Sequence, residues 1–343
     1  MQIDHLIANY KYGKPVLTGS GVEGTYNYKA VDCPHVFSHN GRFYMTHIGF
    51  DGTGYQTGLA VSDDLLHWEN VGTILKRGSN MDWDKVGMAV TTILMDRDLY
   101  GGNKLKKWQG KYWLIYHAYP GEGYESGSAE MGLAWTEDEN LMDWHFYGEP
   151  VFSWKDGAAW ERGGLYKADL VQHDGKFYMF YNAKNRDQEG WMVENVDGEG
   201  WLEQTGMAVS DDLVHWTRPF DHPVLPVDKH SWDSIFASDP QVFYDSVQEK
   251  WVMFYYGLGN LSACDGIAVS DDLYHWKKFP APILTIGAEG TIDSKYAHKP
   301  FVIWHDGALY HFYCACRPYQ EGDPANNDGE FRCISVARTK PWE

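Results

Sequence analysis

An eleven-residue phrase recurs along the chain almost letter for letter. GLAVSDDLLHW at 58–68 returns as GMAVSDDLVHW at 206–216 and as GIAVSDDLYHW at 266–276. Two weaker copies, GLAWTEDENLMDW at 132–144 and ISVARTKPW at 334–342, keep the strand pattern and the closing tryptophan. A phrase that returns at long intervals indicates one supersecondary unit used several times. The chain is therefore expected to be an array of five similar units.

A second phrase, a turn followed by an aromatic strand, precedes each copy. Its five versions are NGRFYMTHIG, QGKYWLIYHA, DGKFYMFYNA, QEKWVMFYYG and DGALYHFYCA. Asn-Gly and Asp-Gly favour tight β-hairpins because both central residues of the turn need positive φ angles. Strand-like segments such as VDCPHVFSH and KADLVQH stand before these turns. Each unit thus reads as a strand, a hairpin, an aromatic strand, a loop, a third strand, the SDDLxHW turn and an outer strand.

These units predict an all-β fold, a five-bladed β-propeller of four-stranded antiparallel blades, because a radial arrangement covers both faces of every sheet. One domain would span residues 1–343, with blades at roughly 29–80, 86–150, 160–220, 230–285 and 293–343. The last unit stops after its third strand, so the N-terminal segment 1–28 is expected to close the ring and remove a free edge. In this interpretation the SDDLxHW turn is structural, since Asp and Ser side chains accept backbone N–H groups.

Composition narrows the class of partner. The formal net charge of −19 disfavours nucleic acid and anionic lipid. No stretch approaches 18 apolar residues and the N-terminus lacks a basic, then apolar leader, so neither a membrane partner nor secretion is expected, and the location is predicted to be cytoplasmic. The five cysteines show no CxxC spacing, and CAC at 314–316 puts two side chains on one strand face. Reduced core thiols are expected.

Acidic residues stand near the start of three predicted inner strands. In a propeller these strands face the axis, so Asp32, Asp169 and Asp239 are expected to converge on one cavity. Carboxyl groups held close together push their pKa values apart, so one is protonated beside another that is ionised. Glycoside hydrolysis needs that pair. Further residues expected to bind substrate are Trp160, Glu161, Arg162, Tyr166, Lys167, Glu203, His298 and Lys299.

The five-bladed plan, the Asp-x-Pro inner strand, the following G-x-[FY]-Y-M strand and the SxDLxHW repeat resemble the clan of glycoside hydrolase families 43, 32, 68 and 130. Family 43 is the nearest guess. The resemblance implies a base Asp on the first blade, matched by Asp32, and a second Asp that tunes the pKa, matched by Asp169 or Asp239. It also implies a channel histidine beside a bound cation, so Ca²⁺ near His298 is a candidate, although no cofactor is expected to be required.

The chain departs from the clan at the proton donor. The clan uses a Glu-x-Pro inner strand, whereas Asp239 directly precedes Pro240 and His298 stands two residues before Pro300. Asp239 is the preferred acid, with His298, Glu161 and Glu203 as the alternatives.

The predicted function is an exo-acting glycosidase of the arabinofuranosidase or xylosidase type, acting on a short oligosaccharide or glycoside. Asp32 would be the base or nucleophile, Asp169 the pKa tuner and sugar anchor, and Asp239 the acid. A phosphorylase or a fructan-type hydrolase on the same fold is the nearest alternative. A non-catalytic carbohydrate-binding or scaffold propeller is the alternative from another class, and an axis lined with acids disfavours it.

Overall fold

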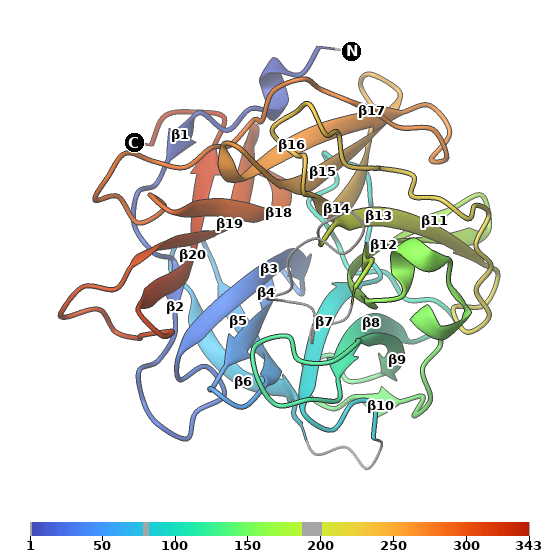
Figure 1. Cartoon of the computed structure of the whole chain (residues 1–343), viewed down its shortest axis with the longest axis horizontal. Helices are drawn as coiled ribbons and strands as arrows, with labels where there is room; N and C mark the ends of the chain where they lie inside the picture. The colour runs from blue at the N-terminus through green and yellow to red at the C-terminus, as the bar shows by residue number, and fades with distance from the viewer. Residues whose placement is uncertain (1, 78–81, 187–200, 343) are drawn as a thin grey trace.

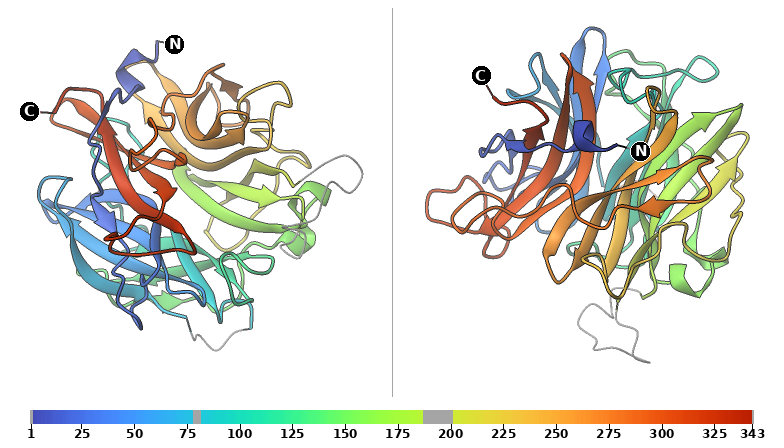
Figure 2. Two further views of the ribbon diagram at one scale, coloured as in Figure 1. Left: turned by 60° about the vertical axis from the view of Figure 1, so that its left-hand side comes forward. Right: turned by 90° about the horizontal axis from the view of Figure 1, so that it is seen from above.

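The computed structural model describes residues 2–77, 82–186 and 201–342. The described chain is all-β, with only three short 3-10 helices, η1 (Asp4–Leu6), η2 (Trp154–Asp156) and η3 (Ala159–Glu161). Antiparallel sheets stand around a common centre in Figure 1, and Figure 2 shows the same sheets from two further sides. In the described residues, no helix has the length and apolar character needed to cross a membrane.

The strands form antiparallel groups that follow the chain. The first holds β3 (Ala30–His39), β4 (Arg42–Phe50), β5 (Tyr55–Ser62) and β6 (Glu69–Leu75). The second holds β7 (Gly87–Ile93), β8 (Tyr112–Tyr119), β9 (Glu130–Thr136) and β10 (His145–Phe146). The third holds β11 (Gly164–His173), β12 (Lys176–Lys184) and β13 (Glu203–Ser210). In the described residues its outer edge is formed by two isolated bridges, Thr205 with Leu225 and Val209 with Thr217, so the prediction of four full strands in every unit is wrong here.

The remaining groups complete the circuit. One holds β14 (Phe236–Asp245), β15 (Lys250–Gly259), β16 (Ser262–Ser270) and β17 (Lys277–Lys278). The other holds β18 (Tyr296–His305), β19 (Ala308–Pro318) and β20 (Glu330–Arg338). Short parallel pairings between β13 and β14 and between β16 and β18 join the last three groups into one sheet. The first strands contact one another in a closed cycle, β3 to β7, β11, β14, β18 and back to β3.

The N-terminal segment pairs with the C-terminal strand. β1 (Tyr10–Lys11) and β2 (Leu17–Thr18) both run antiparallel to β20, with Tyr10 opposite Arg338 and Leu17 opposite Ile334. This is the edge at which the sequence predicts ring closure. Figure 1 shows both chain ends on the same side of the molecule.

The SDDLxHW turns use the same bonds in each close copy. In the third group, Asp212 Oδ1 accepts the backbone N–H groups of Val214 and His215, and Asp212 Oδ2 lies 2.7 Å from His215 Nδ1. Trp216 Nε1 donates to the carbonyl of Leu213, whose φ angle is 67°. The copies at Asp64 and Asp272 repeat this pattern. The structural interpretation of the repeat is confirmed.

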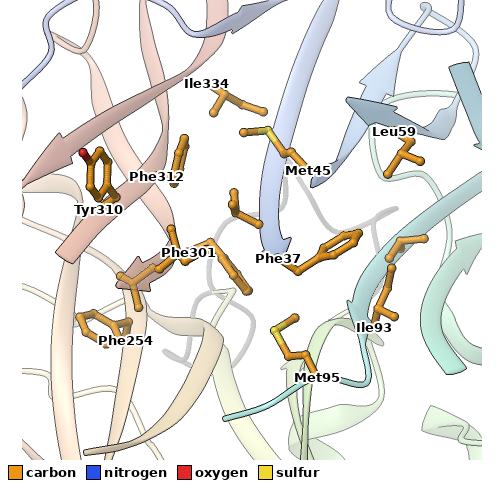
Figure 3. Packing of buried hydrophobic residues seen from close by; sticks show 14 of the residues in the cluster. Phe37, Met45, Leu59, Ile93, Met95, Phe254, Phe301, Tyr310, Phe312 and Ile334 are labelled. Atoms are coloured by element: carbon orange, nitrogen blue, oxygen red, sulfur yellow. The ribbon is translucent and has the colours of Figure 1, made fainter. Parts of the chain in front are cut away.

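Apolar side chains fill the space between neighbouring sheets. Phe37, Met95 and Phe301 point into the region between β3, β7 and β18 in Figure 3, and all three are buried. The apolar faces of the inner strands thus hold the sheets together. The same strands present polar side chains toward one end.

Candidate active site

A cavity of about 870 Å³ lies where the ends of the inner strands meet. Its lining comes from four of those strands, β3, β11, β14 and β18, from the ends of neighbouring strands such as β8, β12, β13 and β20, and from the loops between strands. The described lining residues used below are Glu125, Lys167, Lys184, Glu203, Asp239 and Lys299. Tyr55, Tyr119, Tyr124, Tyr166, Trp201, Phe236, Tyr256 and Tyr296 add aromatic faces. Aromatic faces suit the apolar faces of sugar rings.

Backbone bulges aim some of these side chains. The inner strands β3, β14 and β18 each lose register before a proline, and the residue before that proline has a positive φ angle: 50° at Cys33, 51° at Asp239 and 63° at Lys299. Proline lacks the N–H that a ladder needs, which favours a bulge at that point. All three side chains line the cavity. Asp32 stands one position earlier, equivalent to Ser238 and His298 and not to Asp239.

Asp32 lies behind the cavity wall. It is 2% exposed, and its Oδ2 accepts bonds from Lys299 Nζ at 2.7 Å, Tyr124 Oη at 2.9 Å and Arg332 Nη1 at 3.0 Å. Burial raises its pKa, but Lys299 and Arg332 more than reverse this, so the pKa lies well below its ordinary value. Asp32 is therefore an ionised anchor for two cations that line the cavity.

Asp169 lies in a separate buried cluster. Arg97 Nη2 and Thr92 Oγ1 bind one carboxylate oxygen, and the backbone N–H of Val242 binds the other. Burial raises the pKa of Asp169 despite the neighbouring Arg97. The residue does not line the cavity, so the expected role as a sugar anchor is wrong. Of the three acids predicted to converge, only Asp239 lines the cavity.

Asp239 and Glu203 share one amide nitrogen. Asn182 Nδ2 donates to Glu203 Oε2 at 2.8 Å and to Asp239 Oδ1 at 3.4 Å. Burial raises the pKa of Asp239 to about 7, against the effect of Lys299 and Lys167 and with a contribution from Glu203. Burial also raises the pKa of Glu203. This buried pair can therefore hold a proton near neutral pH.

Glu125 supplies an ionised carboxylate to the same cavity. It lies in the loop between β8 and β9, where Lys184 Nζ is 2.8 Å from its Oε2 and Tyr55 Oη is 3.3 Å from its Oε1. Burial raises its pKa, but Lys184 and Lys299 lower it to about 2. Lys184 Nζ also lies 3.5 Å from Glu203 Oε1, so one buried cation joins the two glutamates.

Sequence reasoning missed Glu125, because its loop carries no repeat phrase. It also missed Asn182, Lys184 and Arg332. One available signal was the length of the loop after β8. The backbone at Glu125 has a φ angle of 59°, which is uncommon for a residue other than glycine and often marks functional sites.

Three predicted substrate residues lie outside the cavity. Trp160 stacks on Tyr181 with ring centroids 6.3 Å apart, and Arg162 donates to the carbonyl of Gly157. Glu161 is buried between Tyr181 Oη at 3.1 Å and Arg218 Nε at 2.7 Å. The prediction for Trp160, Glu161 and Arg162 is wrong. Tyr166, Lys167, Glu203, His298 and Lys299 do line the cavity.

His298 fits neither of the two further roles predicted for it, proton donor and neighbour of a bound calcium ion. Burial, Lys299 and Arg332 lower its pKa to about 3, so the ring is neutral and is no proton donor at neutral pH. A calcium ion takes six to eight oxygen ligands. The potential ligands grouped with His298 in the described residues are the sulfurs of Cys314 and Cys316, and Asp32 is already held by two cations. The donor set does not fit calcium.

Comparisons with known proteins place this chain among enzymes that act on glycosides. No family model matches the chain. A solved structure of a BT0996–RGII complex is 30% identical, with a TM-score of 0.79 over 99% of this chain and 94% of that one. A second, named "Glycoside hydrolase", is also 30% identical, with a TM-score of 0.78 over 98% of this chain and 93% of that one.

More distant matches divide between families. A thermostable family-43 glycoside hydrolase shares the fold at 19% identity, with a TM-score of 0.64 over 96% of this chain and 92% of that one. A β-1,2-mannobiose phosphorylase from Thermoanaerobacter sp. (strain X514) is 25% identical over 162 residues. That alignment spans 46% of this chain and 52% of the phosphorylase, about half the relative's length.

Proposed function

The chain belongs to the β-propeller glycoside hydrolases, and we propose that it is an exo-acting glycosidase that uses Glu125, Glu203 and Asp239. One observation carries this proposal. An ionised carboxylate, Glu125, faces the same cavity as a carboxyl pair whose pKa values are raised, to about 7 for Asp239. Glycoside cleavage requires a proton donor and a carboxylate in one pocket.

The two kinds of carboxyl suit two roles. The Asp239–Glu203 pair donates the proton to the departing glycosidic oxygen, because it still carries a proton near pH 7. Glu125 faces the developing positive charge of the sugar, as a nucleophile or as the base that activates water. Lys184 lies between Glu125 and Glu203 and lowers the pKa of both, but burial outweighs this effect at Glu203, so only the pKa of Glu125 ends below its ordinary value.

The ring of inner strands and the pocket support two further predictions, the five blades and the exo-action. The closed cycle of contacts among β3, β7, β11, β14 and β18 supports five blades. A pocket closed by this ring favours removal of a terminal sugar. An arabinofuranosidase or xylosidase type of activity is the first to test, on arabinofuranosides and xylosides. The cytoplasmic location stays a prediction.

The decisive experiment is a screen of aryl glycosides, with and without inorganic phosphate, that reports the product anomer by NMR.

Glu125→Gln should lower kcat by about 10²-fold or more on every substrate. Asp239→Asn should lose most activity on alkyl glycosides and keep more on aryl glycosides, whose leaving groups need no proton. Glu69→Gln, an exposed glutamate on β6, is the matched control. Full activity of Glu125→Gln would contradict the proposed role.

A phosphorylase is the second candidate, favoured by a buried cation in the cavity. Lys167 is 4% exposed, and among the described residues the one hydrogen bond seen for its Nζ is to the carbonyl of Thr91 at 3.5 Å. Phosphate would suit Lys167 and Lys299. The similarity to a mannobiose phosphorylase points the same way. Turnover that requires phosphate would assign the phosphorylase.

A further inference from the structure

Two cysteines and a histidine meet behind the cavity. His298 on β18 is the register partner of Cys314 on β19, and Cys316 follows on the same face of β19. One potential ligand atom from each of the three lies within 4.8 Å of the others, and all three residues are buried. The two sulfurs are 3.8 Å apart and not joined in a disulfide.

That sulfur spacing suits a metal ion. Two thiolates bound at about 2.3 Å to a tetrahedral zinc lie roughly 3.8 Å from each other. A disulfide would need the sulfurs at about 2.05 Å, with the backbone of one strand distorted to bring them together. We propose that His298, Cys314 and Cys316 bind one thiophilic divalent ion of the Zn²⁺ class.

The Arg332 guanidinium and the backbone carbonyl of Cys314 contact the proposed ligands. Arg332 Nη1 lies 3.7 Å from Cys314 Sγ and donates an N–H to it, a contact that holds this sulfur in place. The Nδ1 atom of His298 lies 3.2 Å from the carbonyl oxygen of Cys314, a bond that fixes the ring beside the sulfurs. Bonds of this kind orient metal ligands in known sites.

The ligand set also selects the class of metal. Thiolate and imidazole ligands suit zinc and other borderline ions, whereas calcium and magnesium need oxygen. His298 lines the cavity while neither cysteine does, so the ion would lie within the wall. Since Arg332 also binds Asp32, the ion would fix the side of the pocket that holds Lys299.

The test uses the full chain, reduced and stripped of metal with a chelator, then titrated with Co²⁺. We expect one Co²⁺ per chain with a sulfur-to-metal charge-transfer band that Zn²⁺ abolishes. Cys314→Ser and Cys316→Ser should each lose the band. Cys264→Ser, which removes a buried thiol on β16 outside this group, should keep it.

Thermal unfolding gives an independent reading. Saturating Zn²⁺ should raise the Tm of the wild-type chain by roughly 2 °C or more, because it binds only the folded state. Ca²⁺ should have no such effect. Zinc in the untreated wild-type protein supports the site without any variant. The proposal is overturned if wild-type protein shows no band and no Zn²⁺-dependent shift, if Ca²⁺ alone stabilises it, or if Cys264→Ser loses the band equally.

Discussion

The residue before each inner-strand proline takes a positive φ angle, yet its chemistry differs from strand to strand. Cys33, Asp239 and Lys299 share this backbone position and all face the cavity. One fold position thus presents a thiol, an acid and a cation to the same space. Of the three, Asp239 is the one whose protonation changes near neutral pH.

Asp239 should set the alkaline limb of activity. Its carboxyl must be protonated to act, and burial raises its pKa to about 7, so kcat/KM should fall as pH rises through 7. The limb should disappear in Asp239→Asn, measured on aryl glycosides. An unchanged limb in that variant would assign the proton to another group.

The same carboxyl should tie stability to pH. Its folded pKa lies above the unfolded value of about 3.9, so the folded state binds an extra proton between these values. The free energy of unfolding should therefore fall as pH rises from about 4 to about 7, and less so in Asp239→Asn. Urea unfolding at several pH values measures this. Parallel curves for both proteins would contradict it.

Lys184 should control Glu125. Replacing this buried cation in Lys184→Met removes the charge that keeps the pKa of Glu125 at about 2, so the acid limb of kcat/KM should move to higher pH. Glu125 and the buried Glu203 would also lose a shared buried cation, which should cost about 3 kcal/mol of stability. Lys176→Met, at the more exposed start of the same strand, is the control. An acid limb that stays in place would assign it to another carboxylate.

At the scale of the element, the SDDLxHW turn is held by its second aspartate. Asp212 accepts two backbone N–H groups, whereas the adjacent Asp211 is 82% exposed at its side chain and 3.8 Å from Lys176. Asp212→Ala should lower the free energy of unfolding by about 1–2 kcal/mol with kcat/KM unchanged. Asp211→Ala should change stability by less than about 0.5 kcal/mol. Denaturant unfolding of both variants checks this, and equal losses would show that the bonds do not matter.

A second repeated element explains the misassigned residues around Trp160. Trp83, Trp160 and Trp232 each stack on a tyrosine of the neighbouring second strand. The acids that follow the last two, Glu161 and Asp233, each accept a bond from that tyrosine hydroxyl at 3.1 Å. The dipeptide Trp-Asp or Trp-Glu before an inner strand is therefore part of the repeat. Aligning the units over this segment would have predicted a packing role.

At the scale of the whole molecule, ring closure should depend on the N-terminal segment. Deleting residues 1–20 removes β1 and β2 and exposes the edge of β20, so the Tm should fall and aggregation should increase. Thermal unfolding and light scattering measure both effects, and a peptide of residues 1–20 added in trans should partly restore the Tm. An unchanged Tm in the truncated chain would show that closure contributes nothing.

The repeats predicted the strands well because hairpin turns and alternating patterns are local. The site was predicted only in part because charge pairing is not local. Asp169 is neutralised by Arg97 and Asp32 by Lys299 and Arg332, partners that lie far apart along the chain. Strand position alone could not show which acids are paired with buried cations and which line the cavity. Glu125 reaches the cavity from a loop, to which the alignment of inner strands does not extend.

The pairing of β1 and β2 with β20 can form only late in synthesis of the chain. The ribosome makes the opening segment first, yet that segment finds its hydrogen-bond partners only after Arg338 has left the exit tunnel. Until then the nascent chain carries two unsatisfied strand edges, which are sites where newly made polypeptides stick together. Ring closure is therefore the last step at which this edge can be covered.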